Sequence, residues 1–156
     1  MPSLRILLVD DDDIVRAALE IRLARQAHLK TVGSVATGEE AILAAERLSP
    51  DLIILDLGLS GLSGMDTMRA IIKSLPQVRI IVLSAAQSPE QIQQAFDSGA
   101  ASYVLKQSSG IDLLEAVQAV IAGPQYASPM VRRNLTGAGG GRIQLPDAPC
   151  PASNGS

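Results

Sequence analysis

The sequence predicts an α/β fold in which five helices cover a parallel sheet of five strands. Short, continuous apolar runs alternate along the chain with longer segments that carry apolar residues at helical spacing. Most of the short runs lack polar positions, as expected for strands that helices cover on both faces. At 156 residues the chain has the length of one such domain.

The predicted strands are the short runs themselves. Four of them are rich in Val, Ile and Leu without polar alternation, and the second along the chain is weaker. We expect strands at residues 4–9, 31–36, 52–55, 78–83 and 102–105.

The helices between these runs are indicated by apolar faces and by their end residues. Residues 92–96 and 113–121 each place apolar side chains on one helical face. Ser88 precedes a first-turn proline, and Gln91 is placed to complete a capping box. Two glycines follow helical segments, where a left-handed residue commonly ends a helix: Gly99 and Gly123.

The chain is predicted to divide into a folded domain and two shorter parts. The domain spans residues 1–123, a linker-like exit segment spans 124–136, and a flexible tail spans 137–156. Eight of the twenty tail residues are Gly or Pro, which favours flexibility. The residues after Gly123 are fewer than the roughly 50 of a small independent domain, so no second folded domain is expected.

Composition and charge exclude several function classes. The formal charge is −3 and only three residues are aromatic, so neither a basic surface nor a row of stacking rings for nucleic acid is present. Cys150 and His28 are the only residues of their types, too few for a disulfide or a zinc cluster. No apolar run approaches a membrane span or a signal peptide, so we expect a cytoplasmic protein that binds neither DNA nor membrane.

The candidate chemistry lies where the predicted strands end. Open parallel sheets bind ligands beyond the carboxyl ends of their strands. Carboxylates crowded there repel each other, and a hard dication such as Mg²⁺ relieves that repulsion. The residues that follow four of the strands are Asp10, Asp11, Asp12 and Asp13, then Asp56, then Ser84, and finally Lys106.

These residue types suit phosphoryl chemistry. A carboxylate beside a metal ion can attack phosphorus and form an acyl phosphate, while a lysine and a hydroxyl stabilise the phosphoryl oxygens. Asp56, Lys106 and Ser84 fill those roles. Each also has an ordinary explanation as a turn or strand-end residue, and Asp12 and Asp13 are expected to be the cap and first turn of a helix. Their coincidence at one edge of one sheet favours a functional site.

The sequence resembles the receiver domain of two-component response regulators over about residues 3–123. The resemblance implies a doubly wound, flavodoxin-like sheet with strand order 2-1-3-4-5. It is carried by five motifs in the family's order: Leu7-Leu8-Val9-Asp10-Asp11, Gly38-Glu39-Glu40-Ala41, Pro50-Asp51-Leu52-Ile53-Ile54-Leu55-Asp56, Ile81-Val82-Leu83-Ser84-Ala85 and Gly99-Ala100-Ala101-Ser102-Tyr103-Val104-Leu105-Lys106.

The resemblance implies a phosphoacceptor and a metal site. Asp56 would receive a phosphoryl group from the phosphohistidine of a sensor histidine kinase. Asp11 and Asp56 would bind Mg²⁺ directly, with the Gly58 carbonyl as a third protein ligand and Asp10 acting through water. Such a protein is a phosphorelay component and not an enzyme, with slow self-dephosphorylation at most.

The resemblance also implies a switch. Lys106 would contact the phosphoryl group, Ser84 would move toward it, and Tyr103 would then turn inward. The surface of the fourth helix, fifth strand and fifth helix would repack, and a homodimer on phosphorylation is expected.

The sequence departs from the family pattern at several positions. Ser60 stands where the family usually has proline, and Gln107 stands where many relatives have a cis-proline, so a trans bond is expected there. Gly58 and Ala86 flank the phosphorylation site without a polar side chain, which predicts a poorly oriented water and a long-lived phosphorylated state.

The segment after Gly123 resembles the exit from NarL-like receivers, which precede a helix-turn-helix DNA-binding domain. No such domain is expected within these 156 residues, so we expect either a stand-alone receiver or one separated from its output domain.

Three other functions are compatible with parts of this pattern. A haloacid-dehalogenase-type phosphatase would use Asp11 as nucleophile, but it lacks a late acidic pair and leaves Asp56 without a role. An FMN-binding flavodoxin is disfavoured because four aspartates would repel the phosphate. A receiver-like protein that only binds partners remains open.

Overall fold

The computed structural model of the chain describes residues 3–86, 88–106, 110–123 and 126–127. The elements run in the order β1 (Leu4–Val9), α1 (Asp13–Ala24), β2 (Leu29–Val35), α2 (Gly38–Leu48), β3 (Leu52–Asp56), α3 (Gly64–Ser74), β4 (Arg79–Ser84), α4 (Pro89–Asp97), β5 (Ser102–Leu105), α5 (Gly110–Ala122) and β6 (Tyr126–Ala127).

The strands form one parallel sheet in the order β2-β1-β3-β4-β5-β6. The first five strands and the five helices confirm the expected doubly wound arrangement with order 2-1-3-4-5. The sixth strand was not predicted, because its two residues fall in the segment interpreted as a linker. In β6, Tyr126 and Ala127 pair with Ser102 and Tyr103 of β5.

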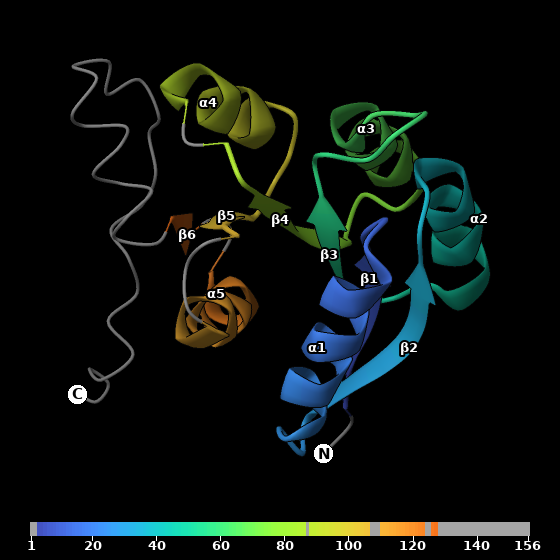
Figure 1. Cartoon of the computed structure of the whole chain (residues 1–156), viewed down its shortest axis with the longest axis vertical. Coiled ribbons are helices and arrows are strands. Elements are labelled where there is room, and N and C mark those ends of the chain that lie inside the picture. Colours follow the sequence, from blue (N-terminus) through green and yellow to red (C-terminus); the bar gives the residue numbers. More distant parts are fainter. Residues whose placement is uncertain (1–2, 87, 107–109, 124–125, 128–156) are drawn as a thin grey trace.

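The helices form one layer on each face of the sheet (Figure 1). Helices α2, α3 and α4 lie on one face, and α1 and α5 lie on the other. Alternate strand residues supply the two cores, so Ile53 and Leu55 pack with the first group while Ile54 packs with the second. Since both faces are buried, the strands contain the unbroken apolar runs that the sequence showed.

Polar caps begin the helices where the sequence indicated them. Asp12 caps α1 by accepting hydrogen bonds from the amides of Ile14 and Val15. Ser88 caps α4 and accepts from the Gln91 amide at 3.2 Å. The Ser88 hydroxyl itself donates to Glu90, two residues on.

Some helix ends and strand bounds differ from the prediction. Gly99 has a positive φ of 115° after α4, as expected, whereas Gly123 is not among the described residues with positive φ. Helix α2 instead ends on Ser49 in the left-handed conformation, with φ 48°. Strand β2 covers Leu29–Val35 where residues 31–36 were expected.

Several other expectations concern residues outside the part of the chain that the structure describes. They are the trans bond at Gln107, the tail of residues 137–156 and most of the exit segment, residues 124–136. In the described part of the chain, no helix combines the length and apolar character needed to cross a membrane.

Gly64 allows α3 to begin directly against the end of β3. A Cβ atom at this position would lie 2.5 Å from Leu57 Cα and 2.7 Å from the Asp56 carbonyl oxygen. Backbone atoms cannot move aside as a flexible side chain can. The approach of α3 to the loop after Asp56 therefore requires glycine.

We expect Gly64→Ala to lower the free energy of unfolding by about 1–3 kcal/mol, because the methyl group would push α3 away from the loop. Gly123→Ala is the matched control, since its Cβ would meet nothing closer than the Ala119 carbonyl oxygen at 3.8 Å. Urea unfolding measures both variants. Equal stability of Gly64→Ala and the parent chain would contradict the close approach.

Candidate functional site

Four adjacent strands deliver the predicted site residues to one edge of the sheet. Asp10 directly follows β1, and Lys106 directly follows β5. Asp56 and Ser84 are the last residues of β3 and β4, not the first residues beyond them. Because the strands are parallel and in register, their carboxyl ends lie side by side.

Three carboxylates meet at this edge. Asp10, Asp11 and Asp56 each offer an oxygen, and these oxygens all lie within 4.8 Å of one another. Asp10 is 1% exposed and Asp56 is 3% exposed, whereas Asp11 faces solvent. Oxygen donors open to solvent on one side fit Mg²⁺, which binds few protein carboxylates and keeps several waters.

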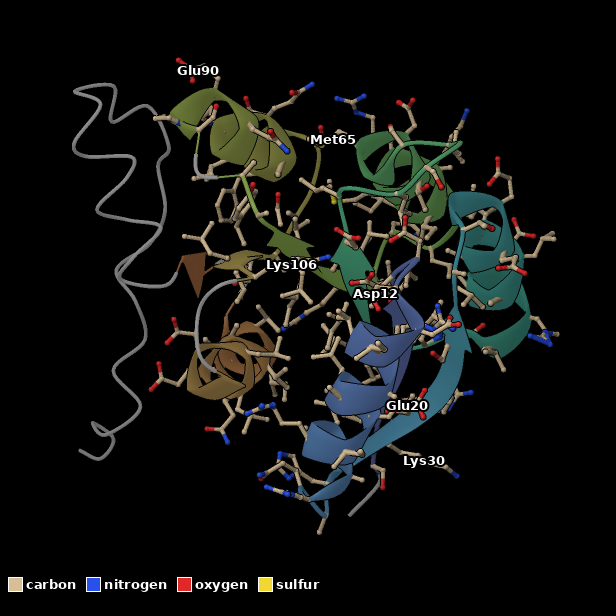
Figure 2. All side chains as sticks on the ribbon, in the orientation of Figure 1. Asp12, Glu20, Lys30, Met65, Glu90 and Lys106 are labelled. Carbon is tan, nitrogen blue, oxygen red and sulfur yellow. The ribbon has the colours of Figure 1, made fainter. Side chains whose placement is uncertain are left out.

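Lys106 lies between the two buried carboxylates. Its Nζ atom is 3.2 Å from Asp10 Oδ2 and 3.1 Å from Asp56 Oδ2. Figure 2 shows the side chain reaching from the end of β5 toward β3. Burial acts to lower the pKa of Lys106, but the hydrogen bond and charge of Asp56, together with Asp10, outweigh it and raise the pKa. The ammonium group therefore stays charged.

Ionisation of Asp10 is opposed by the burial of its carboxyl group. Burial raises its pKa, although the amide of Asp12, which donates to Oδ1 at 2.9 Å, acts in the opposite direction. Its other oxygen, Oδ2, is buried and, among the described residues, has no partner beyond the ion pair with Lys106. A buried carboxylate oxygen with spare capacity suits a metal-bound water or a cation.

Asp56 is held by the loop that follows it. Its Oδ1 atom accepts a hydrogen bond from the Gly58 amide at 2.9 Å. A Cβ atom on Gly58 would lie 3.4 Å from that same oxygen, so residue 58 lines the space around the carboxylate. Because Oδ1 is bound by Gly58 and Oδ2 by Lys106, the carboxylate has one defined orientation.

Ser84 and Tyr103 are connected through the backbone of Ala86. Ser84 Oγ accepts from the Ala86 amide at 3.0 Å, and the Tyr103 hydroxyl donates to the Ala86 carbonyl at 3.0 Å. Burial raises the pKa of Tyr103, and a hydrogen bond involving Ser84 opposes it. The Tyr103 side chain is fully buried in this structure.

Sequence reasoning missed Arg16. Its side chain extends from α1 to the edge of the sheet where Asp10, Asp11 and Asp56 lie, which we call the acidic edge. Its guanidinium contacts the carbonyl oxygen of Asp10 and the carboxylate of Asp13. An arginine three residues after an aspartate in a helix suggests only a local ion pair. The contact with Asp10 depends on how α1 leaves β1, which the spacing alone does not reveal.

Comparison with known proteins identifies the family. The response regulator receiver domain family matches residues 6–118, most of the described chain. The chain belongs to this family. It is a receiver domain of two-component systems, and its homologues are response regulators. The family match favours this assignment over the haloacid-dehalogenase alternative.

Similar proteins support the same assignment. The response regulator protein VraR of Staphylococcus aureus (strain NCTC 8325 / PS 47) is 34% identical over 129 residues, 83% of this chain and 62% of VraR. A LuxR-family two-component response regulator from Aurantimonas sp. SI85-9A1 is 30% identical with a TM-score of 0.83, covering 87% of this chain and 97% of that structure.

The isolated REC domain of RcsB from Salmonella enterica serovar Typhimurium, solved in the presence of phosphomimetic BeF3⁻, is 25% identical with a TM-score of 0.80. That match covers 85% of this chain and 99% of the RcsB domain. The LuxR-family structure, together with the signal receiver domain of NarL from Mycobacterium tuberculosis (26% identical, TM-score 0.73), agrees with the branch suggested by the exit segment. The chain spans 62% of the length of the VraR sequences it matches.

We expect Asp10→Asn to raise the Tm of the metal-free receiver at pH 7, because the substitution removes a buried charge. A gain on the order of 1 kcal/mol corresponds to about 3–5 °C for a domain of this size. Thermal unfolding in a chelator measures the change, and Glu20→Gln is the control because Glu20 is exposed on α1.

The pH dependence has a defined sign. Because the folded-state pKa of Asp10 is raised, ionisation of Asp10 costs stability above that pKa, and the cost vanishes below the ordinary value of 3.8. The advantage of Asp10→Asn over the parent chain should therefore shrink as the pH falls toward 3.8. A lower Tm than the parent at pH 7 would show that the ion pair with Lys106 outweighs burial.

Proposed function

We propose that this receiver accepts a phosphoryl group on Asp56 from the phosphohistidine of a sensor histidine kinase. The supporting observation is the buried Asp56 carboxylate, oriented by Gly58 and 3.1 Å from the Lys106 ammonium. An Asp56 oxygen attacks phosphorus, the P–N bond to the donor imidazole breaks, and its electron pair remains on the imidazole. The product is an acyl phosphate.

Asp11 and Asp56 would bind Mg²⁺ directly, with the Gly58 carbonyl as a third protein ligand and Asp10 acting through water. The acidic cluster of Asp10, Asp11 and Asp56 supports this assignment. When bound, Mg²⁺ offsets the negative charge that phosphoryl oxygens bring into the site. Lys106, whose ammonium contacts both Asp10 and Asp56, would supply a second positive charge.

The proposal includes the switch. Lys106 contacts the phosphoryl oxygens, and Ser84 turns its hydroxyl from the Ala86 amide toward them. The backbone of Ala86 then moves together with the Tyr103 hydroxyl that it binds. The α4–β5–α5 surface repacks in response.

The wider role is part of the same proposal. A sensor histidine kinase is the phosphodonor, and the phosphorylated receiver forms a homodimer in the cytoplasm without itself binding DNA. The dimer is suggested by a relative, since RcsB has been solved as two dimers bound to two parallel DNAs. The chain is a phosphoacceptor and not an enzyme with turnover.

Incubation with Mg²⁺ and acetyl phosphate should place one phosphoryl group on Asp56, stable to acid and labile to base. Mass spectrometry of the whole chain and of its peptides locates the modification. Asp56→Ala should lose it completely, because among the described residues only Asp56 is a buried carboxylate that contacts both Lys106 and the Gly58 amide. The control is Asp51→Asn, which changes an exposed aspartate near the start of β3 and should retain the phosphoryl group.

An unmodified parent chain would favour a receiver that only binds partners. Modification of Asp11 in place of Asp56 would contradict the assigned phosphoacceptor.

The phosphorylated state should be long-lived, with a lifetime of minutes or more, because Gly58 and Ala86 offer no polar side chain to orient a water. Gly58→Asn should shorten the lifetime several-fold, since its Cβ would lie 3.4 Å from Asp56 Oδ1 and its amide would reach the acyl phosphate. Gly58→Ala is the control that adds the Cβ without a polar group. Loss of phosphate from the parent within a few seconds would contradict this.

A further inference from the structure

Arg16 is a second cation at the acidic edge, and it contacts the backbone instead of the carboxylates that bind Lys106. Its Nη1 atom donates to the carbonyl oxygen of Asp10 at 2.6 Å, and Nη2 donates to Asp13 Oδ1, also at 2.6 Å. Only 17% of the side chain is exposed. Two short, charge-assisted hydrogen bonds therefore hold the guanidinium in one place.

The carbonyl that Arg16 contacts belongs to the peptide group joining Asp10 to Asp11. Fixing this peptide fixes the direction in which the chain leaves β1 and turns into α1. The Asp11 side chain makes no hydrogen bond or ion pair within the described residues, so only its backbone positions it. The separation of the Asp10 and Asp11 carboxylates thus depends on a peptide that Arg16 holds.

The third nitrogen of the Arg16 guanidinium indicates that this placement costs free energy. Its Nε atom is buried and has no hydrogen-bond partner in the part of the chain that the structure describes. Buried donors without partners are uncommon and require an explanation. A planar guanidinium can contact a carbonyl and a carboxylate together with fixed geometry, which the single nitrogen of a lysine cannot.

We propose that Arg16 is a positioning residue for the metal-binding carboxylates and acts through the Asp10–Asp11 peptide. The inference rests on the proposed function, because it requires these carboxylates to bind Mg²⁺. Charge alone predicts the opposite effect, since a nearby guanidinium repels a dication. The sign of the change in Mg²⁺ affinity therefore separates positioning from simple electrostatics.

The test compares Mg²⁺ binding by Arg16→Lys, Arg16→Gln and the parent chain. Calorimetric titration with MgCl2 gives the affinity, and thermal unfolding without Mg²⁺ gives the stability. We expect both variants to bind Mg²⁺ about 10-fold more weakly, as is typical when a group that orients metal ligands is lost. Arg16→Lys is informative because it retains the charge and loses the two-pronged contact.

Arg69 provides the matched control. It forms the same type of ion pair, three residues along a helix, with Asp66 of α3 at 3.3 Å, and its Nε donates to Ser98. Arg69→Lys and Arg69→Gln should leave Mg²⁺ affinity unchanged. Any effect confined to Arg16 then reflects its contact with the Asp10 carbonyl and not the loss of a helical ion pair.

Each other outcome overturns the inference. Tighter Mg²⁺ binding by Arg16→Gln with parent-like binding by Arg16→Lys would show that only charge matters. A lower Tm with unchanged Mg²⁺ affinity would show that Arg16 only stabilises α1. If the parent chain itself fails to bind Mg²⁺, the proposed function fails and the role of Arg16 fails with it.

Discussion

Asp10 and Asp56 share one ammonium group, since Lys106 Nζ lies 3.2 Å from one carboxylate and 3.1 Å from the other. The register of the parallel strands imposes this crowding, because it brings the ends of β1, β3 and β5 to one edge. One ammonium cannot neutralise two buried carboxylates and the exposed Asp11 beside them. Burial is the main cause of the raised pKa of Asp10, and the negative charge of Asp56 adds to it. The excess of negative charge makes the site suitable for a dication.

A short series of contacts connects Ser84, at the carboxyl end of β4, with strands β5 and β6. Ser84 accepts from the Ala86 amide, and the Ala86 carbonyl accepts from the Tyr103 hydroxyl. Tyr103 in turn pairs with Ala127 of β6. A change at Ser84 therefore has a direct route to β5 and to the strand beside it. If the α4–β5–α5 surface repacks, the segment after α5 is affected as well, since its strand β6 pairs with β5.

The sequence was sufficient for the strand ends but not for the contacts between them. Continuous apolar runs located four strands closely, and Asp56, Ser84 and Lys106 were assigned to one edge because parallel strands end together. Strand β6 was missed because two residues next to a proline-containing segment carry no periodic pattern. Its pairing depends on the edge of β5, which exists only in the folded sheet.

Two other features were invisible for similar reasons. Ser49 ends α2 with a φ of 48°, although glycine is the usual residue for that conformation. Arg16 looked like one half of a local ion pair, and its contact with the Asp10 carbonyl arises from the turn between β1 and α1. The sequence pattern reports which face a residue occupies, whereas these features depend on where the backbone turns.

The two cations at the acidic edge differ in what phosphorylation can change. Lys106 contacts carboxylate oxygens, so a phosphoryl group on Asp56 would compete for the same ammonium and redistribute its contacts. Arg16 contacts a backbone carbonyl and the exposed Asp13, neither of which gains or loses charge in the transfer. Lys106 can therefore change its contacts when Asp56 is phosphorylated, while Arg16 keeps the β1–α1 turn in place. Under the proposed function, the contact of Arg16 with the Asp10 carbonyl would keep the carboxylates of Asp10 and Asp11 in place even when Lys106 moves.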